Sequence, residues 1–421
     1  MISQRKRKRN HLINLYHNKS KINNSKDIDI DVDRLNVEKE KSKVARFDFL
    51  LLLCVLILSS FGVLIIYSAT KYSLPAGISD PQYYFKKQLI VLIASIGVFL
   101  LFLLFDYRKL KKFWVVVFII NIALLVSVLI FGYEINSNKA WIDLKFISIQ
   151  PSEFSKIFMV ICLAATLSRW QSEKKDVVGF KKVASATGIA FLTILLVLLE
   201  PDLGQAIIYF LVFIGMLFIS GANLLYIIGI IILASGAVFA GIKFGLIQEY
   251  QLDRLLVFLK PDVKPEGAGY NLFQSKLAIG SGKLFGKGLF LGTQTNLNYV
   301  PEHHTDFIFS VIGEELGFVG AFFTIVLFGI IIWRCFYISR HASDFFGFLL
   351  AGGIGFIILT QVIINIGMTI GLMPIIGITL PFLSYGGSNL LSIFIGIALV
   401  ENVYFRRELR RDYEVAYEEF S

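Results

Sequence analysis

The chain has 421 residues, of which 56% are hydrophobic and only 17% are charged, a balance that excludes an ordinary soluble domain. Its formal net charge of +10 is concentrated in one place, because residues 1–46 hold 13 Lys and Arg against 6 Asp and Glu. We expect this basic tail to be disordered, to rest at most near anionic membrane lipids, and to have no nucleic-acid partner.

Apolar stretches long enough to cross a hydrocarbon core of about 30 Å recur over residues 47–405. We predict an all-α integral membrane protein with about ten transmembrane helices, near residues 47–68, 88–105, 113–131, 154–167, 183–199, 203–219, 224–246, 307–333, 345–370 and 390–404. Lys and Arg gather in alternate connections, so the positive-inside rule places both termini in the cytoplasm. The tails are then 1–46 and 406–421, and one long extracytoplasmic loop covers about 247–306.

Glu153 and Lys156 stand at the start of the fourth predicted span, three residues apart and hence on one helical face. Each charge alone would cost about 2.5–3.5 kcal/mol at mid-membrane, so we expect the two to pair toward the protein interior. Such a pair either only stabilises the structure, or forms part of a polar cavity for a charged lipid headgroup or a coupler to a partner.

Glu200-Pro201-Asp202-Leu203-Gly204 interrupts the apolar sequence between the fifth and sixth spans. Pro201 supplies a turn, and Asp202 is the predicted N-cap of the next helix. If this turn faces the cavity, Asp202 can also take part in substrate binding.

The long extracytoplasmic loop holds two further patterns. Residues 252–259 place Leu and Phe around Asp253 and Arg254, which suits either a short helix on the membrane surface or a buried connector. Residues 280–288 resemble a phosphate loop but lack its spacing and its Ser or Thr, so we predict no nucleotide site. Lys283 and Lys287 would still suit a diphosphate, unless the segment is an ordinary series of turns.

Asp306 lies where a polar loop, beginning at Pro301, turns into an apolar run. Keeping an acid at such a boundary is costly for packing alone, so the position favours chemistry. We predict that Asp306 is a catalytic base with His304 and Thr305 as hydrogen-bonding neighbours. An alternative hypothesis makes Glu302, the two histidines and Asp306 metal ligands.

Prolines and glycines break the apolar region over residues 370–389. Broken backbone at membrane depth is tolerated only where it is buried in protein or lines a cavity. Ser384 and Ser388 in this region therefore either face a ligand or satisfy the backbone groups that the break leaves unpaired.

These motifs occur together and in order in the SEDS family of bacterial cell-wall polymerases, which the chain resembles from about Phe47 to Phe405. The most specific matches are Pro301-Glu302, His304–Phe309 and Gly313-Glu314-Glu315-Leu316-Gly317. The remaining matches are Trp141–Leu144, Gln150–Glu153 with Lys156, Pro201–Gly204, Ala278–Gly282, Asn365–Met368, Leu380–Phe382 and Ser384–Ser388. Gly292-Thr293-Gln294 and Gly367–Pro374 resemble the RodA branch, for elongation, more than the FtsW branch, for division.

The resemblance implies a multi-pass protein of the bacterial cytoplasmic membrane that polymerises lipid II into glycan strands at the outer face, with a class B penicillin-binding transpeptidase as partner. Asp306 would take the proton of the acceptor sugar's 4-hydroxyl as it attacks with inversion. The departing diphosphate needs positive charge, for which Arg254, Lys283, Lys287 or a divalent cation, Mg²⁺ or Mn²⁺, are candidates. The expected substrate-binding residues are Glu153, Lys156, Arg254, Gln274, Ser275, His304, Thr305, Ser384 and Ser388.

Two other function classes fit many spans, broken helices and intramembrane charges. One is a transporter that flips lipid II, and the other is a scaffold that only recruits a transpeptidase. The predicted position of Asp306 at the outer face favours the polymerase, because a flippase needs its main charges at mid-membrane.

Overall fold

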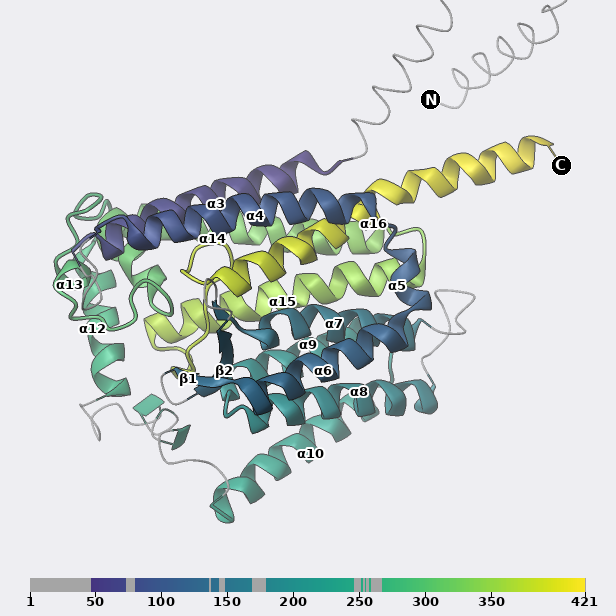
Figure 1. Ribbon diagram of the computed structural model, residues 1–421, viewed down its shortest axis with the longest axis horizontal. Coiled ribbons are helices and arrows are strands. Elements are labelled where there is room, and N and C mark those ends of the chain that lie inside the picture. The colour runs from purple at the N-terminus through teal and green to yellow at the C-terminus, as the bar shows by residue number, and fades with distance from the viewer. Residues whose placement is uncertain are drawn as a thin grey trace, which may run out of the picture. The chain divides into compact units, whose positions relative to one another are not determined.

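Long apolar helices dominate the structure, as the composition predicts (Figure 1). The computed structural model describes residues 47–72, 80–135, 138–143, 148–168, 179–245, 251–252, 254, 257–258 and 267–420, so the predicted N-terminal tail lies outside the described residues. The helices are α3 (Phe49–Thr70), α4 (Tyr83–Leu104), α5 (Arg108–Lys112), α6 (Trp114–Phe131), α7 (Pro151–Leu167), α8 (Phe180–Leu199), α9 (Leu203–Ile219), α10 (Leu224–Lys243), α12 (Ala268–Ser281), α13 (Thr293–Asn296), α14 (Ile308–Arg340), α15 (Phe345–Ile370) and α16 (Gly387–Phe420).

Three short strands lie between α6 and α7: β1 (Tyr133–Ile135), β2 (Asn138–Asp143) and β3 (Ser148–Ile149). They pair antiparallel in the order β1-β2-β3, with Tyr133 opposite Trp141 and Ile142 opposite Ile149. These strands were not predicted, because strands this short offer too few positions for a recognisable period of two. Only Gln150 separates β3 from Pro151, the first residue of α7.

The prediction of an all-α membrane protein is confirmed. Among the described residues, eight helices are long and apolar enough to cross a membrane: α3, α4, α6, α8, α10, α14, α15 and α16. Helices α7 and α9, with 17 residues each, occupy two further predicted spans, and the total of about ten stays a prediction. At the C-terminus α16 continues to Phe420, through the segment expected to be a tail, which is rich in Glu and Arg, both strong helix formers.

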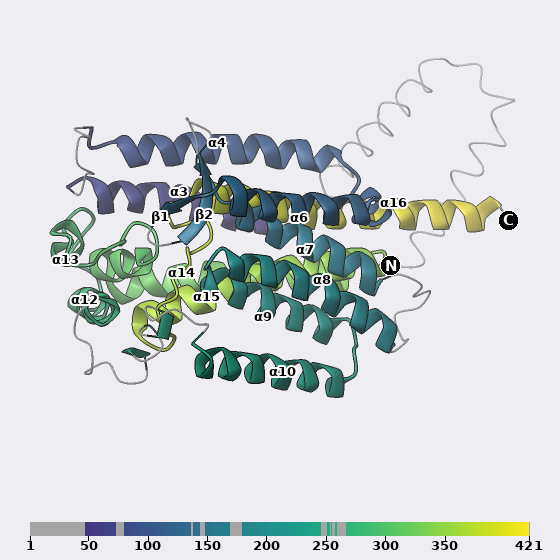
Figure 2. The ribbon, with the colours of Figure 1, turned by 60° about the horizontal axis from the view of Figure 1, so that its bottom comes forward.

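Burial sorts the helices into an inner and an outer set. In α15, 78% of the most apolar window is buried inside the protein, whereas in α10 the share is 6%, with Ile227 the one buried residue. Figure 2 shows α10 at the edge of the bundle and α7, α9 and α15 within it. The large apolar side chains that are exposed on the outer helices therefore face the hydrocarbon of the membrane, where they are not in contact with water.

Buried charges join three helices at the end of the bundle that carries α5. Asp48 caps α3 by accepting from the N–H of Leu51 (3.1 Å), and it accepts from Nε of Arg334 in α14 (2.7 Å). The backbone N–H of Asp48 donates to Glu401 of α16 (3.1 Å). Because a buried charge without a partner is costly, these contacts fix the relative positions of α3, α14 and α16.

Helix α14 is kinked at Gly317, whose φ of 66° lies in the left-handed region. At the kink the N–H groups of Phe318 and Val319 donate to the carbonyl oxygens of Lys283 (2.9 Å) and Leu284 (3.1 Å). A Cβ at Gly317 would collide with the backbone of Leu284 and Gly286. Residues 280–288, the glycine-rich segment, are thus attached to α14 through their backbone.

Candidate active site

A tight turn places Asp306 at the start of α14. The carbonyl oxygen of Glu302 accepts from the N–H groups of Thr305 (3.2 Å), Asp306 (3.0 Å) and Phe307 (3.2 Å), and Glu302 has a φ of 51°. Asp306 therefore stands two residues before Ile308, the first residue of α14. This agrees with the boundary position that the sequence predicts for the carboxylate.

Two distant segments, α15 and residues 384–385, hold the backbone of this turn. Asn365 of α15 donates to the carbonyl oxygen of Asp306 (2.8 Å), and Ser384 donates to that of Thr305 (2.5 Å). The N–H of Tyr385 donates to the carbonyl oxygen of His304 (2.9 Å). Ser384 Oγ also accepts from the N–H of Leu380 (2.8 Å), so the structure gives this side chain backbone partners on both sides. Its predicted contact with substrate stays a prediction.

The two histidines occupy different environments. Both ring nitrogens of buried His303 lie against carbonyl oxygens, Nδ1 at 2.8 Å from Val300 and Nε2 at 2.9 Å from Ala69 at the end of α3. The ring of His304 packs on Tyr84 of α4, with centroids 4.9 Å apart. Burial, and next His303, lower the pKa of His304 to about 4, so its imidazole is neutral near pH 7.

The hypothesis of a metal site in this motif lacks a donor set. The nitrogens of His303 are both taken by backbone oxygens, and the described residues contain no group of three or more His, Cys, Asp and Glu that could hold a metal. The divalent cation proposed from the sequence stays a prediction, and we assign it no protein ligands.

Asp306 is partly buried, and its surroundings disfavour its charge. Burial, and next the negative charge of Glu302, raise the pKa of Asp306 to about 7, while the positive charge of Arg254 opposes the shift. A Cβ at Gly377 would stand 3.2 Å from Asp306 Oδ2 and 3.8 Å from an Nη of Arg254. Because a side chain here would press against the carboxylate, and because the φ of Gly377 is 68°, the glycine lets the backbone lie close to both groups.

A second cluster of polar residues surrounds Glu153 and Lys156. Lys156 Nζ lies 2.7 Å from Glu153, both side chains are at most 2% exposed, and the predicted pairing is confirmed. Gln205 of α9 donates its Nε2 to the other oxygen of Glu153 (2.6 Å). The buried pair thus receives a hydrogen bond from outside its own helix, which helps to compensate the cost of burying charge.

Asp202 connects the two clusters. It caps α9 as predicted, because it accepts a hydrogen bond from the N–H of Gln205 (3.0 Å). It also accepts from the side-chain amide of Gln150 (3.3 Å). The backbone N–H of Gln150 in turn donates to Ser388 Oγ (2.9 Å). Burial raises the pKa of Asp202 to about 6, and the carboxylate lies within electrostatic range of Lys156, Arg254 and Asp306. Lys156 in α7 and Asp306, just before α14, therefore both lie within electrostatic range of Asp202.

Glu200 was not among the predicted site residues. It is fully buried, and neither carboxylate oxygen has a hydrogen-bond partner in the described part of the chain. Burial, and next Asp202, raise the pKa of Glu200 to about 8, so it is mostly protonated near pH 7. The signal for it in the sequence was its place beside Pro201 and Asp202, at a break in the apolar pattern.

Helix α12 carries two predicted site residues, Gln274 and Ser275. Ser275 is buried, its Oγ lies 2.7 Å from Ser310 Oγ, and it donates to the carbonyl oxygen of Thr369 (2.8 Å). Gln274 is half-buried and its Oε1 has no partner among the described residues. Ser275 therefore joins α12 to α14 and α15, and the binding role of both residues stays a prediction.

The predicted surface helix over residues 252–259 is described only in part, since Asp253, Leu255, Leu256 and Leu259 lie outside the described residues. Val257 is 3% exposed and packs in a small cluster with Phe307, the residue after the acid. Residues 252, 254, 257 and 258, which the structure describes, are helical, as the first alternative predicts, whereas the packing of Val257 buries this part of the segment, as the second predicts.

Glu314 organises the glycine-rich segment. Its buried carboxylate accepts from the N–H groups of Thr293 (2.8 Å), Gln294 (2.9 Å) and Thr295 (3.0 Å), at the start of α13. It also binds Lys287 Nζ at 2.6 Å. Lys287, a candidate for a substrate diphosphate, is thus paired with a protein carboxylate.

Glu314→Gln is expected to loosen this segment, because the neutral amide is a weaker acceptor for three N–H groups and leaves Lys287 without its counter-ion. The free energy needed to open this segment locally is expected to fall by about 1.5–3 kcal/mol, the range for hydrogen bonds to charged groups. Limited proteolysis between residues 283 and 300 would measure it, with Asp80→Asn as a control at an exposed ion pair. An unchanged cleavage rate would contradict the role given to Glu314.

Comparisons with known proteins show the family of the chain. The family model FtsW/RodA/SpoVE, described as cell cycle protein, matches residues 48–409. The chain belongs to this family, the SEDS family. Among its relatives, this SEDS protein is 37% identical over 370 residues to the probable peptidoglycan glycosyltransferase FtsW of Trichlorobacter lovleyi, covering 86% of this chain and 93% of that one. It is 39% identical over 294 residues to the peptidoglycan glycosyltransferase MrdB of Escherichia coli K12, covering 69% and 78%.

Solved structures share the fold of this SEDS protein. A chain from a peptidoglycan synthase complex that coordinates polymerization and crosslinking matches with a TM-score of 0.71 and 25% identity, covering 86% of this chain and 98% of that one. The rod shape determining protein RodA of Thermus thermophilus matches with a TM-score of 0.63 and 25% identity, covering 86% and 97%.

Proposed function

We propose that this SEDS protein is a peptidoglycan glycosyltransferase that polymerises lipid II at the outer face of the bacterial cytoplasmic membrane. Relatives named as peptidoglycan glycosyltransferases cover most of the chain. The observation that carries the proposal is the placement of Asp306, partly buried just before the first residue of a membrane helix, beside Arg254 and the backbone of Gly377.

The arrangement suits an inverting displacement at a sugar whose leaving group is a lipid diphosphate. Asp306, in its ionised form, accepts the proton of the acceptor's 4-hydroxyl while that oxygen bonds to the anomeric carbon and the bond to the diphosphate breaks. Its pKa of about 7 matches such a base to neutral pH. The guanidinium of Arg254 supplies positive charge next to the reacting groups, where the diphosphate departs.

Purified protein incubated with lipid II, followed by gel separation of the products, tests the proposal. Glycan strands are expected from the isolated chain. A flippase or a scaffold would give none under the same conditions, so an absence of strands from folded protein would favour one of those two functions.

Arg254→Gln is expected to shift the pH profile of glycan synthesis to higher pH. The positive charge of Arg254 lowers the pKa of Asp306, so removing that charge raises this pKa. A higher pH is then needed to ionise the carboxyl group of Asp306. Rates measured from pH 5.5 to 9 would show a higher midpoint and a lower plateau. Arg254→Lys, which keeps the charge, should restore the midpoint more than the plateau; a profile unchanged in Arg254→Gln would contradict the electrostatic role.

We also propose that the chain serves elongation, like the RodA branch, with a class B penicillin-binding transpeptidase as partner. The relatives named FtsW and MrdB are 37% and 39% identical to the chain, so identity does not distinguish the two branches. The RodA branch is supported instead by the two RodA-like stretches, Gly292-Thr293-Gln294 and Gly367–Pro374. The partner is supported by the matching chain of a peptidoglycan synthase complex. Depletion in growing cells should give round cells for an elongation role and filaments for a division role.

A further inference from the structure

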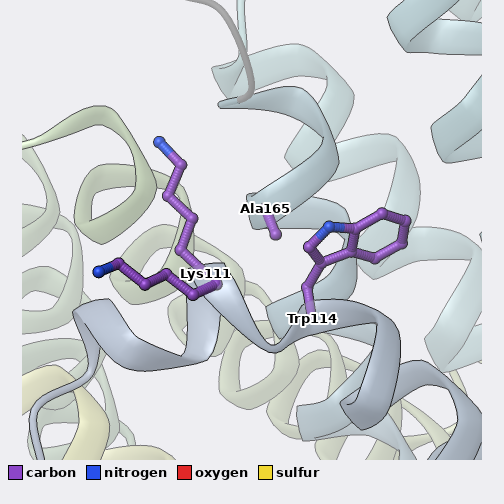
Figure 3. A pocket seen from close by; sticks show the side chains of 4 residues that line it. Lys111, Trp114 and Ala165 are labelled. Atoms are coloured by element: carbon purple, nitrogen blue, oxygen red, sulfur yellow. The ribbon is translucent and has the colours of Figure 1, made fainter.

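A cavity of about 490 Å³ opens where α5 meets α6 and α7, and Lys111, Lys112, Trp114 and Ala165 line it (Figure 3). Ala165 follows Glu153 by twelve residues along α7, which corresponds to about 18 Å at 1.5 Å per residue. The cavity is therefore separate from the candidate active site, which lies at the other end of α7.

The lining combines an apolar wall with a basic rim. Ala165 is nearly fully buried and is too small to fill the space, and the indole of Trp114 lies beside it (Figure 3). The side chains of Lys111 and Lys112 are exposed at the rim. An apolar wall next to two ammonium groups matches a ligand that has an acyl chain and a negative headgroup.

The basic rim is held in place by its neighbours. Arg108, at the start of α5, donates to Ser343 Oγ (3.2 Å) and to the carbonyl oxygen of Arg406 (3.3 Å). Lys111 Nζ donates to the carbonyl oxygen of Ser168, at the end of α7 (3.4 Å), which leaves its other protons for a ligand. Helix α5 is thus attached to the bundle through residues near both of its ends.

The position along the membrane normal agrees with this chemistry. Arg108–Lys112 is one of the basic connections that the positive-inside rule places in the cytoplasm. Trp114 is the first residue of α6, at the depth where indole rings prefer the interface. The cytoplasmic leaflet carries anionic lipids.

We propose that this cavity binds one anionic phospholipid of the cytoplasmic leaflet. Lys111 and Lys112 bind the headgroup phosphate, and Trp114 and Ala165 contact the first part of an acyl chain. An inorganic phosphate would use the rim alone and leave the apolar wall without a partner.

Trp114 provides the probe. The chain has four tryptophans, so the variant Trp141→Phe/Trp170→Phe/Trp333→Phe reports from the cavity only. In phosphatidylcholine vesicles, brominated phosphatidylglycerol should quench Trp114 at about 30-fold lower mole fraction than brominated phosphatidylcholine, the preference expected from two lysines near a membrane surface.

Two double variants in the same background locate the effect. Lys111→Gln/Lys112→Gln should abolish the preference. Lys181→Gln/Lys182→Gln removes two charges at the start of α8, outside the cavity lining, and should keep it. Equal quenching by both lipids, equal losses in both double variants, or loss of the preference on addition of millimolar inorganic phosphate would each overturn the proposal.

Discussion

Asp306→Asn is expected to lower the rate of glycan synthesis from lipid II by about 10²–10⁴-fold, the usual contribution of a general base. The amide has nearly the same shape but cannot accept the proton of the attacking hydroxyl. Asp80→Asn is a suitable control, because Asp80 precedes α4 as an exposed carboxylate paired with Lys86. A fall of less than about tenfold in folded Asp306→Asn would remove Asp306 from the chemistry.

The pH dependence follows from the same carboxylate. Its pKa is raised from 3.8 to about 7, so the rate of the wild-type protein should rise with pH through about 7, as the base ionises. Stability changes with pH in the opposite direction. Between about pH 4 and pH 7 the carboxyl group of Asp306 is protonated in the folded state and ionised in the unfolded state, so its contribution to the unfolding free energy falls as pH rises from about 4 to 7. Asp306→Asn should therefore not be less stable than wild type at pH 8, which separates lost chemistry from lost folding.

Lys156→Met alone is expected to destabilise the protein by about 3–5 kcal/mol, because it leaves the charge of Glu153 buried without its partner. The double variant Glu153→Gln/Lys156→Met should recover most of this loss, since it removes both charges and keeps an oxygen that can accept from Gln205. Unfolding in mixed micelles would measure both. The exposed pair Asp80–Lys86 is the matched control, and its removal should cost less than about 1 kcal/mol.

Activity of the double variant distinguishes the two roles considered for this pair. A folded double variant without glycan synthesis would place Glu153 and Lys156 in substrate binding or its control. Wild-type rates in that variant would leave the pair a structural role only. A change of less than about 1 kcal/mol in Lys156→Met would contradict the buried geometry itself.

Features that depend on neighbours along the chain could be predicted from the sequence. The bounds of α15 agree with the predicted 345–370 because Asp344 caps one end and left-handed Gly371 the other, around an unbroken apolar run. The pairing of Glu153 with Lys156 and the capping of α9 by Asp202 are contacts over three residues. The position of Asp306 at the end of α14 follows from the change in polarity around it.

Contacts between residues that are far apart in the sequence could be identified only from the tertiary structure. His303 contacts Ala69 across 234 residues, and Gln205 reaches Glu153 across 52. No local periodicity encodes such pairs, because they depend on how whole helices pack. The bare Gly377 beside Asp306 and Arg254, and the buried Glu200, which has no hydrogen-bond partner among the described residues, are visible only once those helices are placed. Hydrophobic patterning could place the carboxylate at the membrane boundary, whereas its electrostatic surroundings depend on contacts between helices.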